Sequence, residues 1–311
     1  MDSVRSVRCP VLKNVLATLM IAAIPWIGCT ERETGLLPVG SSAASVIEQT
    51  RYVKRLHLDL TGLLPSDADI DAAITRLAAE GDTPATRAEM ADDLLATPAF
   101  AALFASELEN RVFGGGSAND TYALFCPVLQ DSDPACAGCA YAADCGGCDC
   151  PTMVALAEER LSLIKSADDI AAGDATLTDI ERRYASSQIF TFNAGSAESI
   201  TQGLFENFLG RPAEPDEQKN ARAMVFGALV EGSVSGLLFH QHGADYADLI
   251  TILFTSEVYR DAAVDAVFLR YLGRGASPEE LAFFSGSLAD EKLDVRPVMR
   301  AVLSSREYFT Q

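Results

Sequence analysis

The amino-acid sequence predicts an all-α protein of stacked helical repeat units, which form one or two bundle-like domains, with an irregular Cys-rich insertion. Three observations favour this fold. From Val46 onward, apolar residues recur at spacings of three and four, without the alternation that marks a half-buried strand. Alanine, the best helix former, is abundant in the same region. Short segments also recur in a constant order, as stacked helical units require.

Composition and charge exclude several classes of protein. The chain has 311 residues, of which 49% are hydrophobic, so it can bury a sizeable core and is not intrinsically disordered. Its 24 basic and 44 acidic residues give a formal net charge of −20. Because an acidic surface repels nucleic acid, we expect no nucleic-acid partner.

Residues 1–28 resemble the signal peptide of a bacterial lipoprotein. A basic start precedes the apolar run VLATLMIAAIPWIG, which is too short for a comfortable transmembrane helix. The run ends at Gly28-Cys29, which resembles a lipobox, the site where the signal is removed and the Cys thiol is diacylated. Trp26 departs from the Leu that is usual at its position in that pattern. The alternative is an ordinary cleaved signal in which Cys29 has no role.

Residues 29–45 contain Gly, Pro and Ser without periodicity, which predicts a flexible tether. The residues directly after Cys29 resemble a sorting signal for the outer membrane. We therefore expect a protein of the cell envelope, attached to the outer membrane through an N-terminal lipid anchor, on its periplasmic or surface face.

The first helical unit is expected over residues 46–113. Three apolar residues share one face of its first helix: Val53, Leu56 and Leu60. Gly62 follows as the residue that ends this helix. Asp59 is a short acid within an apolar helix, which is costly unless the acid is paired. Arg55 lies one turn earlier, so we predict a structural ion pair between Arg55 and Asp59.

Capping signals divide the rest of this unit. Ser66, with Asp69 three residues later, predicts the start of a second helix, which Gly81 ends. Thr97-Pro98 then predicts the N-cap and first residue of another helix.

The run RLHLDLTGLLPSDADID, followed by LLATPAF, resembles a secreted bacterial domain family of unknown function (family 1549). That family is known beside cytochrome-c-like modules in large planctomycete proteins. The matching residues are Arg55, Leu58, Asp59, Leu60, Thr61, Gly62, Leu63, Pro65, Ser66, Leu94, Leu95, Pro98 and Phe100. The resemblance implies export and a helical fold, and it implies no reaction. The sequence has no Cys-x-x-Cys-His motif for haem, and we expect no cofactor.

Residues 114–152 form the expected Cys-rich insertion, whose six cysteines are Cys126, Cys136, Cys139, Cys145, Cys148 and Cys150. We favour three disulfides, because exported proteins oxidise such clusters and small loops cannot build a core. Two alternatives stay open. Cys136-x-x-Cys139 and Cys145-x-x-Cys148 have the spacing of zinc ligands, and Cys150-Pro151 suggests an iron–sulfur cluster, although the other spacings do not fit one.

Residues 153–200 are expected to be connecting helices, and residues 201–311 to be two further repeats. Within the connecting region, Thr178 and Glu181 predict a capping box for a helix that ends near Phe192.

The two later repeats begin with LFENFLGRP at 204–212 and VFLRYLGRG at 267–275, so Gly210 and Gly273 occupy the same position. Each repeat then reaches a Pro-acid-acid helix start and a final element, LFTSEVY at 253–259 or LSSREYF at 303–309. The first unit has the same order, from LHLDLTG at 56–62 to LLATPAF at 94–100.

The second copy is longer, and its extra residues are expected between 231 and 244. This segment contains His240 and His242, two imidazoles close enough to be weak candidates for a metal site. The simpler interpretation is that they are ordinary loop histidines.

The sequence therefore favours a non-enzymatic exported lipoprotein, which acts as a helical-repeat scaffold or interaction module for a protein partner in the envelope. We find no convergent set of catalytic residues, such as a Gly-x-Ser-x-Gly nucleophile motif. The alternative is a periplasmic redox or metal-binding accessory protein that uses the Cys-rich insertion.

Overall fold

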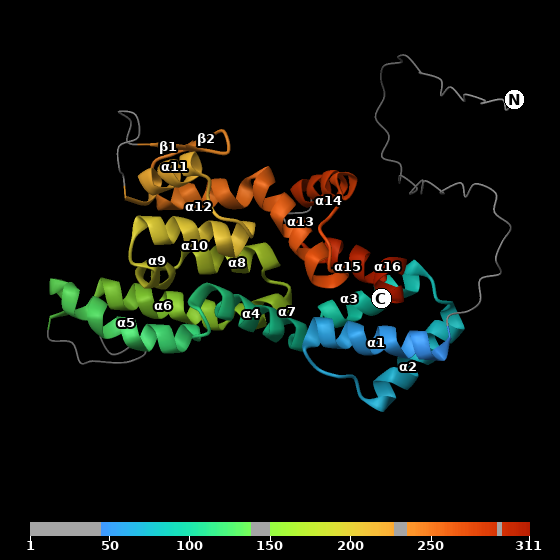
Figure 1. Cartoon of the computed structure of the whole chain (residues 1–311). Helices are drawn as coiled ribbons and strands as arrows, with labels where there is room; N and C mark the ends of the chain where they lie inside the picture. Colours follow the sequence, from blue (N-terminus) through green and yellow to red (C-terminus); the bar gives the residue numbers. More distant parts are fainter. Residues whose placement is uncertain (1–44, 138–149, 227–234, 291–293) are drawn as a thin grey trace, which may run out of the picture. The chain divides into compact units, whose positions relative to one another are not determined.

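The computed structural model describes residues 45–137, 150–226, 235–290 and 294–311, and it has the predicted all-α fold (Figure 1). Residues Ala43–Gln311 form one compact unit. The helices in its described residues are α1 (Val46–Thr61), α2 (Asp67–Glu80), α3 (Pro84–Leu95), α4 (Pro98–Phe113), α5 (Ala118–Ser132), α6 (Pro151–Ile164), α7 (Ser166–Ala172), α8 (Leu177–Ser186), α9 (Gln188–Ala194), α10 (Ala197–Leu209), α11 (Pro215–Phe226), α12 (Tyr246–Thr255), α13 (Glu257–Leu272), α14 (Pro278–Asp290), α15 (Arg296–Ser304) and α16 (Arg306–Thr310), with a short 3₁₀ turn at Pro134–Cys136.

A Ser or Thr cap with an aromatic residue three positions later begins four of the described helices. The cap hydroxyl accepts a hydrogen bond from the backbone amide of the aromatic residue three positions later. The four pairs are Thr97 with Phe100, Ser187 with Phe190, Ser256 with Tyr259 and Ser305 with Tyr308. The sequence comparison finds three of these copies, and the structure adds the fourth, at Ser187.

The Gly-Arg pairs of the two later repeats, Gly210-Arg211 and Gly273-Arg274, form the same contacts in both copies. Gly210 ends α10 in the left-handed region, at φ 64°, which a glycine adopts without steric cost. Arg211 then donates two hydrogen bonds of 2.7 Å to Glu217, and its guanidinium lies 5.4 Å from the centre of the Phe205 ring. The next repeat forms the same contacts with Gly273, Arg274, Glu280 and Phe268.

The predicted start at Thr178 is wrong, because α8 begins two residues earlier. Thr176 and Asp179 form the capping box, and α8 ends at Ser186 instead of running to Phe192. Both pairs of residues have the spacing of a capping box. Directly after α8, Ser187 caps a separate helix, α9, and Phe190 of α9 is buried.

The predicted irregular insertion begins with a helix. Residues 118–132 form α5, which contains Pro127 and packs along α6. Beyond α5, the short 3₁₀ turn ends at Cys136, and residues 138–149 lie outside the described residues.

The extra residues of the second copy form a β-hairpin that the sequence pattern does not predict. Strand β1 (Gly236–Leu238) pairs antiparallel with β2 (Gln241–Gly243). The two-residue turn places Phe239 and His240 at positive φ, where such turns usually have Asn-Gly. The Phe239 ring lies 6.1 Å from the Phe205 ring, so packing against α10 offsets the backbone strain.

The last repeat packs against the first. Helix α15 lies along α3, and α16 contacts α1 and α13 (Figure 1). Arg87 of α3 is almost fully buried and donates a hydrogen bond of 2.9 Å to the carbonyl oxygen of Ser304. The Tyr52 ring of α1 contacts the rings of Tyr308 and Phe309, at 5.9 and 5.2 Å between centres. The C-terminal helices thereby complete the core of the first unit.

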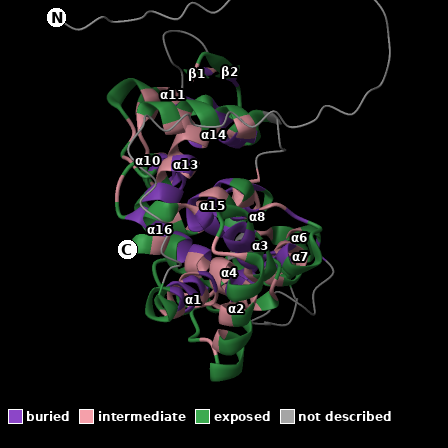
Figure 2. Ribbon diagram, turned by 90° about the vertical axis from the view of Figure 1, so that its right-hand side faces the viewer, coloured by how far each residue is buried: buried purple, intermediate pink, exposed green. Residues whose placement is uncertain are grey.

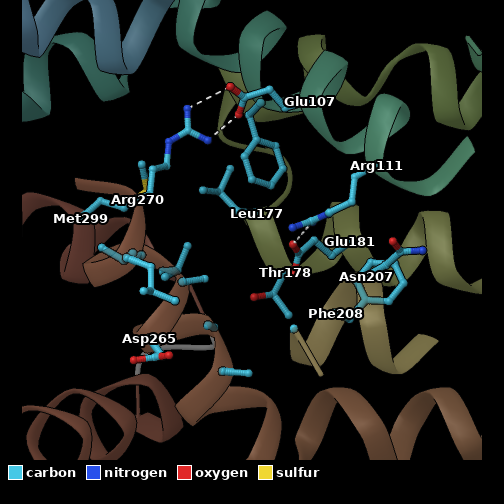
Figure 3. A pocket seen from close by; sticks show the side chains of 18 of the residues that line it. Glu107, Arg111, Leu177, Thr178, Glu181, Asn207, Phe208, Asp265, Arg270 and Met299 are labelled. Atoms are coloured by element: carbon cyan, nitrogen blue, oxygen red, sulfur yellow. Dashed lines mark hydrogen bonds and ion pairs between the residues drawn. The ribbon is translucent and has the colours of Figure 1, made fainter. Parts of the chain in front are cut away.

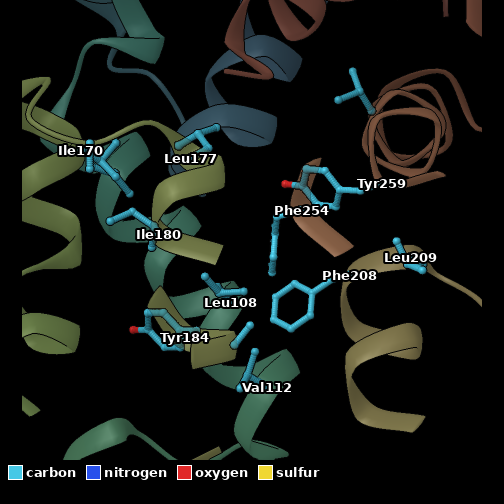
Figure 4. Packing of buried hydrophobic residues seen from close by; sticks show 14 of the residues in the cluster. Leu108, Val112, Ile170, Leu177, Ile180, Tyr184, Phe208, Leu209, Phe254 and Tyr259 are labelled. Carbon is cyan, nitrogen blue, oxygen red and sulfur yellow. The ribbon is translucent and has the colours of Figure 1, made fainter. Parts of the chain in front are cut away.

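Individual helices carry both buried and exposed residues, as amphipathic helices packed on a core do (Figure 2). In the interior, Leu108 and Val112 of α4 and Tyr184 of α8 lie near a row of aromatic rings (Figure 4). In this row, Phe254 contacts Phe208 at 5.3 Å and Tyr259 at 4.8 Å between ring centres.

Candidate functional site

A cleft of about 290 Å³ opens where α4, α8, α10, α13 and α15 meet (Figure 3). Most of its lining is apolar, from Phe100, Leu103, Phe104, Leu177, Phe208, Leu209, Ala262, Ala263, Ala266, Val267, Leu269, Val295 and Met299. Its volume is close to the lower end for small-molecule sites, and apolar walls with a few polar groups are typical of binding sites. We therefore treat the cleft as the candidate functional site.

The first polar group of the cleft is an ion pair between α4 and α13. Arg270 donates hydrogen bonds of 2.5 and 3.0 Å to the two carboxylate oxygens of Glu107. Burial disfavours the charged form of Arg270, but the hydrogen bonds to Glu107 outweigh this effect and raise the pKa of Arg270. Because both side chains are about 42% exposed, the pair lies at the mouth of the cleft.

A second group joins α4, α8 and α13. Arg111 donates a hydrogen bond of 2.6 Å to Oε1 of Glu181, and the Tyr259 hydroxyl donates one of 2.6 Å to Oε2 of the same carboxylate. The Tyr259 hydroxyl also lies 3.1 Å from the hydroxyl of Thr178. Burial, with the neighbouring charge of Glu181, raises the pKa of Tyr259 well above its usual value. Tyr259 therefore stays protonated at any ordinary pH.

The remaining polar side chains are acidic or neutral. Asp265 accepts a hydrogen bond of 2.8 Å from the backbone amide of Ala276, and Glu206 accepts one of 2.8 Å from Gln202. The half-buried amide of Asn207 completes the set. The cleft is thus lined by four carboxylates and two guanidinium groups, so its electrostatic potential favours cations over anions.

Three of these polar residues occupy equivalent positions in the repeats. Arg111, Asn207 and Arg270 each lie three residues before a glycine that ends a helix in the left-handed conformation. In the first unit the same position is Asp59. The cleft is not predicted from the sequence, although the recurrence of a polar residue three positions before each of these glycines is a signal that points to it.

Arg55 and Asp59 form the ion pair expected from the sequence, at 3.4 Å between Nε and Oδ2. The pair does not line the cleft. Arg55 donates a hydrogen bond of 2.7 Å to the carbonyl oxygen of Tyr271 and lies 4.3 Å from the centre of the Tyr308 ring. Its position indicates a structural role in holding the C-terminal helix.

The other singled-out residues of the repeats occupy helix ends. Ser66 caps α2 with Asp69, Pro98 is the first residue of α4, and Pro65 lies between α1 and α2. Gly62 and Gly273 end α1 and α13. Gly210 ends α10 in the same way, and it also lines the cleft.

The Cys-rich segment contains a disulfide between Cys136 and Cys150, with an S–S distance of 2.05 Å. Cys126 is also disulfide-bonded. A sulfur atom in a disulfide does not bind zinc as a thiolate, so Cys136 is not a zinc ligand in this state. The predictions for Cys29, Cys139, Cys145 and Cys148 lie outside the described residues.

His240 lies in the hairpin turn and His242 in β2, and both are exposed. In the part of the chain that the structure describes, no three His, Cys, Asp or Glu side chains gather as a metal site would require. None of the described helices is both long and apolar enough to span a membrane.

No protein-family model, curated protein or solved structure matches the chain. The resemblance of residues 55–100 to the secreted bacterial domain family stays a prediction.

Proposed function

We propose that this chain is a non-enzymatic, lipid-anchored protein of the cell envelope that binds an apolar, basic segment of a protein partner in the cleft. The observation that carries the proposal is the combination of apolar walls with an excess of carboxylates in one cavity. Apolar side chains of the partner would fill the cavity, and Lys or Arg beside them would approach Glu206 and Asp265.

The chemistry of the lining favours binding over catalysis. The described residues that line the cleft include no Ser, Cys, His or Lys, so among the common catalytic side chains only carboxylates, Tyr and one Thr are present. Glu107 and Glu181 are each paired with an Arg, and Tyr259 stays protonated. These groups are therefore suited to fixing the orientation of helices and of a bound segment.

Export and the anchor are supported by the sequence of residues 1–45. A basic start, an apolar run and Gly28-Cys29 are followed by a polar tether of irregular sequence. The disulfide between Cys136 and Cys150 is consistent with an oxidising compartment such as the periplasm.

The anchor is tested by the intact mass of the chain extracted from membranes. We expect a chain that starts at Cys29 and carries a diacylglyceryl group on its thiol. A chain that starts elsewhere, without lipid, would contradict the anchor.

The cleft is tested with two labelled amphipathic peptides, one built of Leu and Lys and one of Leu and Glu. Fluorescence anisotropy should show that the Leu/Lys peptide binds more tightly. Ala263→Phe, which places a ring in the cleft, should weaken this binding by about tenfold or more, a change of about 1.4 kcal/mol. Ala79→Phe on the exposed face of α2 is the matched control and should leave it unchanged. Equal binding of both peptides, or equal binding by both variants, would overturn the proposal.

A further inference from the structure

Helix α1 has two different apolar faces. One is buried in the core and consists of Tyr52, Val53, Leu56 and Leu60. The other is exposed, and its residues follow one another at spacings of four, three and four: Ile47, Arg51, Lys54 and Leu58. Because this spacing keeps residues on one side of a helix, the four side chains form a single stripe that is both apolar and basic.

The loop after α1 extends this stripe. Leu64 is 72% exposed and lines a shallow depression together with Ile47, Leu58 and the basic residues of the stripe. Five of the thirteen large exposed apolar side chains of the described residues lie in this short region: Val46, Ile47, Leu58, Leu63 and Leu64. Such gathering of exposed apolar side chains marks an interaction surface.

The charge of the stripe is opposite to that of the chain. Arg51 and Lys54 are exposed, and within the described residues neither forms an ion pair, whereas the chain has a net charge of −20. Basic residues beside apolar ones on a helix surface are typical of a face that lies on anionic lipid, with the apolar side chains among the acyl chains.

The position of α1 in the chain favours a bilayer as the occupant. Helix α1 is the first described element, and it directly follows the tether of residues 29–45. A segment of this length reaches at most about 60 Å from end to end, so α1 would stay near the membrane that carries the lipid.

We propose that the stripe of α1, together with Leu64, lies on an anionic phospholipid bilayer. Ile47, Leu58 and Leu64 enter the interface, and Arg51 and Lys54 contact the phosphate groups. The proposal rests on the proposed lipid anchor, which brings α1 to the bilayer, and the stripe then supplies a second membrane contact. This contact would also fix the orientation of the protein on the membrane surface.

The test uses the chain exported from a cleavable signal in place of residues 1–28, with Cys29→Ser, so that no lipid is attached. Trp26, the single Trp of the sequence, lies in the replaced residues 1–28, so one introduced Trp reports its own surroundings. Leu64→Trp is the reporter, and Phe283→Trp, at a position 68% exposed on α14, is the matched control. Both are mixed with vesicles of phosphatidylcholine, with or without phosphatidylglycerol.

We expect a blue shift of Leu64→Trp emission with phosphatidylglycerol vesicles, and no shift of Phe283→Trp. Binding should weaken about 30-fold in Arg51→Gln/Lys54→Gln, since each basic residue near the surface contributes about 1 kcal/mol. Lys165→Gln/Arg306→Gln, which removes two exposed basic residues elsewhere, should leave it unchanged.

Equal shifts at both reporters, or no shift with anionic vesicles, would overturn the proposal. A shift that a poly-Glu peptide causes and vesicles do not would also overturn it, in favour of an acidic protein. Because the tested chain has no lipid, these outcomes are independent of the mass measurement that tests the anchor.

Discussion

The hydroxyl of Tyr308 donates a hydrogen bond of 2.8 Å to Oδ2 of Asp59, which lies 249 residues earlier in the chain. Arg55 pairs with the same carboxylate and lies over the ring of Tyr308. The three side chains join the last helix to the first. An equivalent group in the interior consists of Arg111, Glu181 and Tyr259, so an Arg, an acid and a Tyr recur at contacts between units.

The Tyr308–Asp59 contact predicts a measurable coupling energy. Burial, together with the charge of Asp59, raises the pKa of Tyr308, so the hydroxyl stays a donor at all ordinary pH values. Tyr308→Phe should lower the free energy of unfolding in urea by about 1–2 kcal/mol. In a double-mutant cycle with Asp59→Ala, which removes the acceptor, we expect a coupling of about 1 kcal/mol. Strictly additive effects would show that the contact does not stabilise the fold.

Low pH should weaken the ion pair between Arg274 and Glu280 in the last repeat. The hydrogen bonds from Arg274, with those from Ser277, lower the pKa of Glu280 from 4.5 to about 2. Because the folded-state pKa is depressed, this stabilisation is present above pH 4.5 and is lost as the pH falls toward 2. The stability difference between the native chain and Glu280→Gln should therefore shrink across this window.

Urea unfolding at a series of pH values checks this expectation. Glu279→Gln is the control, because Glu279 is an exposed neighbour on the same helix turn with no ion pair in the described residues. Its effect should be small and nearly independent of pH. A stability difference for Glu280→Gln that stays constant down to pH 2 would contradict the assigned pKa.

A buried hydroxyl in α10 should be replaceable with a gain in stability. Thr201 is fully buried, and its hydroxyl has no hydrogen-bond partner among the residues that the structure describes. Thr201→Val, which keeps the shape and removes the unpaired group, should raise the free energy of unfolding by about 1 kcal/mol. Thr178→Val should lower it by a similar amount, because Thr178 is hydrogen-bonded to Tyr259. Equal signs for the two substitutions in thermal melts would refute this account.

Two glycines should respond in opposite directions to the same substitution. A Cβ added at Gly210 or Gly286 meets no atom of the described residues within 4 Å, so the backbone conformation distinguishes the two positions. Gly286 lies inside α14, and Gly286→Ala should stabilise the protein by about 0.5–1 kcal/mol. Gly210 has a φ of 64°, and Gly210→Ala should destabilise it by about 1 kcal/mol. Calorimetry of both variants provides the comparison.

Local chemistry explains what could be predicted from the sequence. Gly62, Ser66 and Thr97 act on residues within one turn of themselves, so their roles at helix ends follow from spacing. The Arg55–Asp59 pair is likewise one helical turn apart. Thr176 and Thr178 show the limit of such spacing rules, because both have an acid three residues later and only Thr176 caps α8.

The cleft depends on contacts that no local spacing encodes. Glu107 and Arg270 are 163 residues apart, and Arg111 and Glu181 are 70 residues apart. The hairpin was missed for a related reason. Its strands have three residues each, too few to show an alternating pattern, and packing of Phe239 on α10 holds a turn that the residue types alone disfavour.

Hydrogen exchange read by mass spectrometry, with and without the Leu/Lys peptide, tests the central claim that the cleft is a binding site. We predict slower exchange in residues 100–111, 177–181 and 259–271, which line the cleft, and unchanged exchange in α2. Ala263→Phe should abolish this protection. Protection that is absent, or confined to segments away from the cleft, would contradict the account.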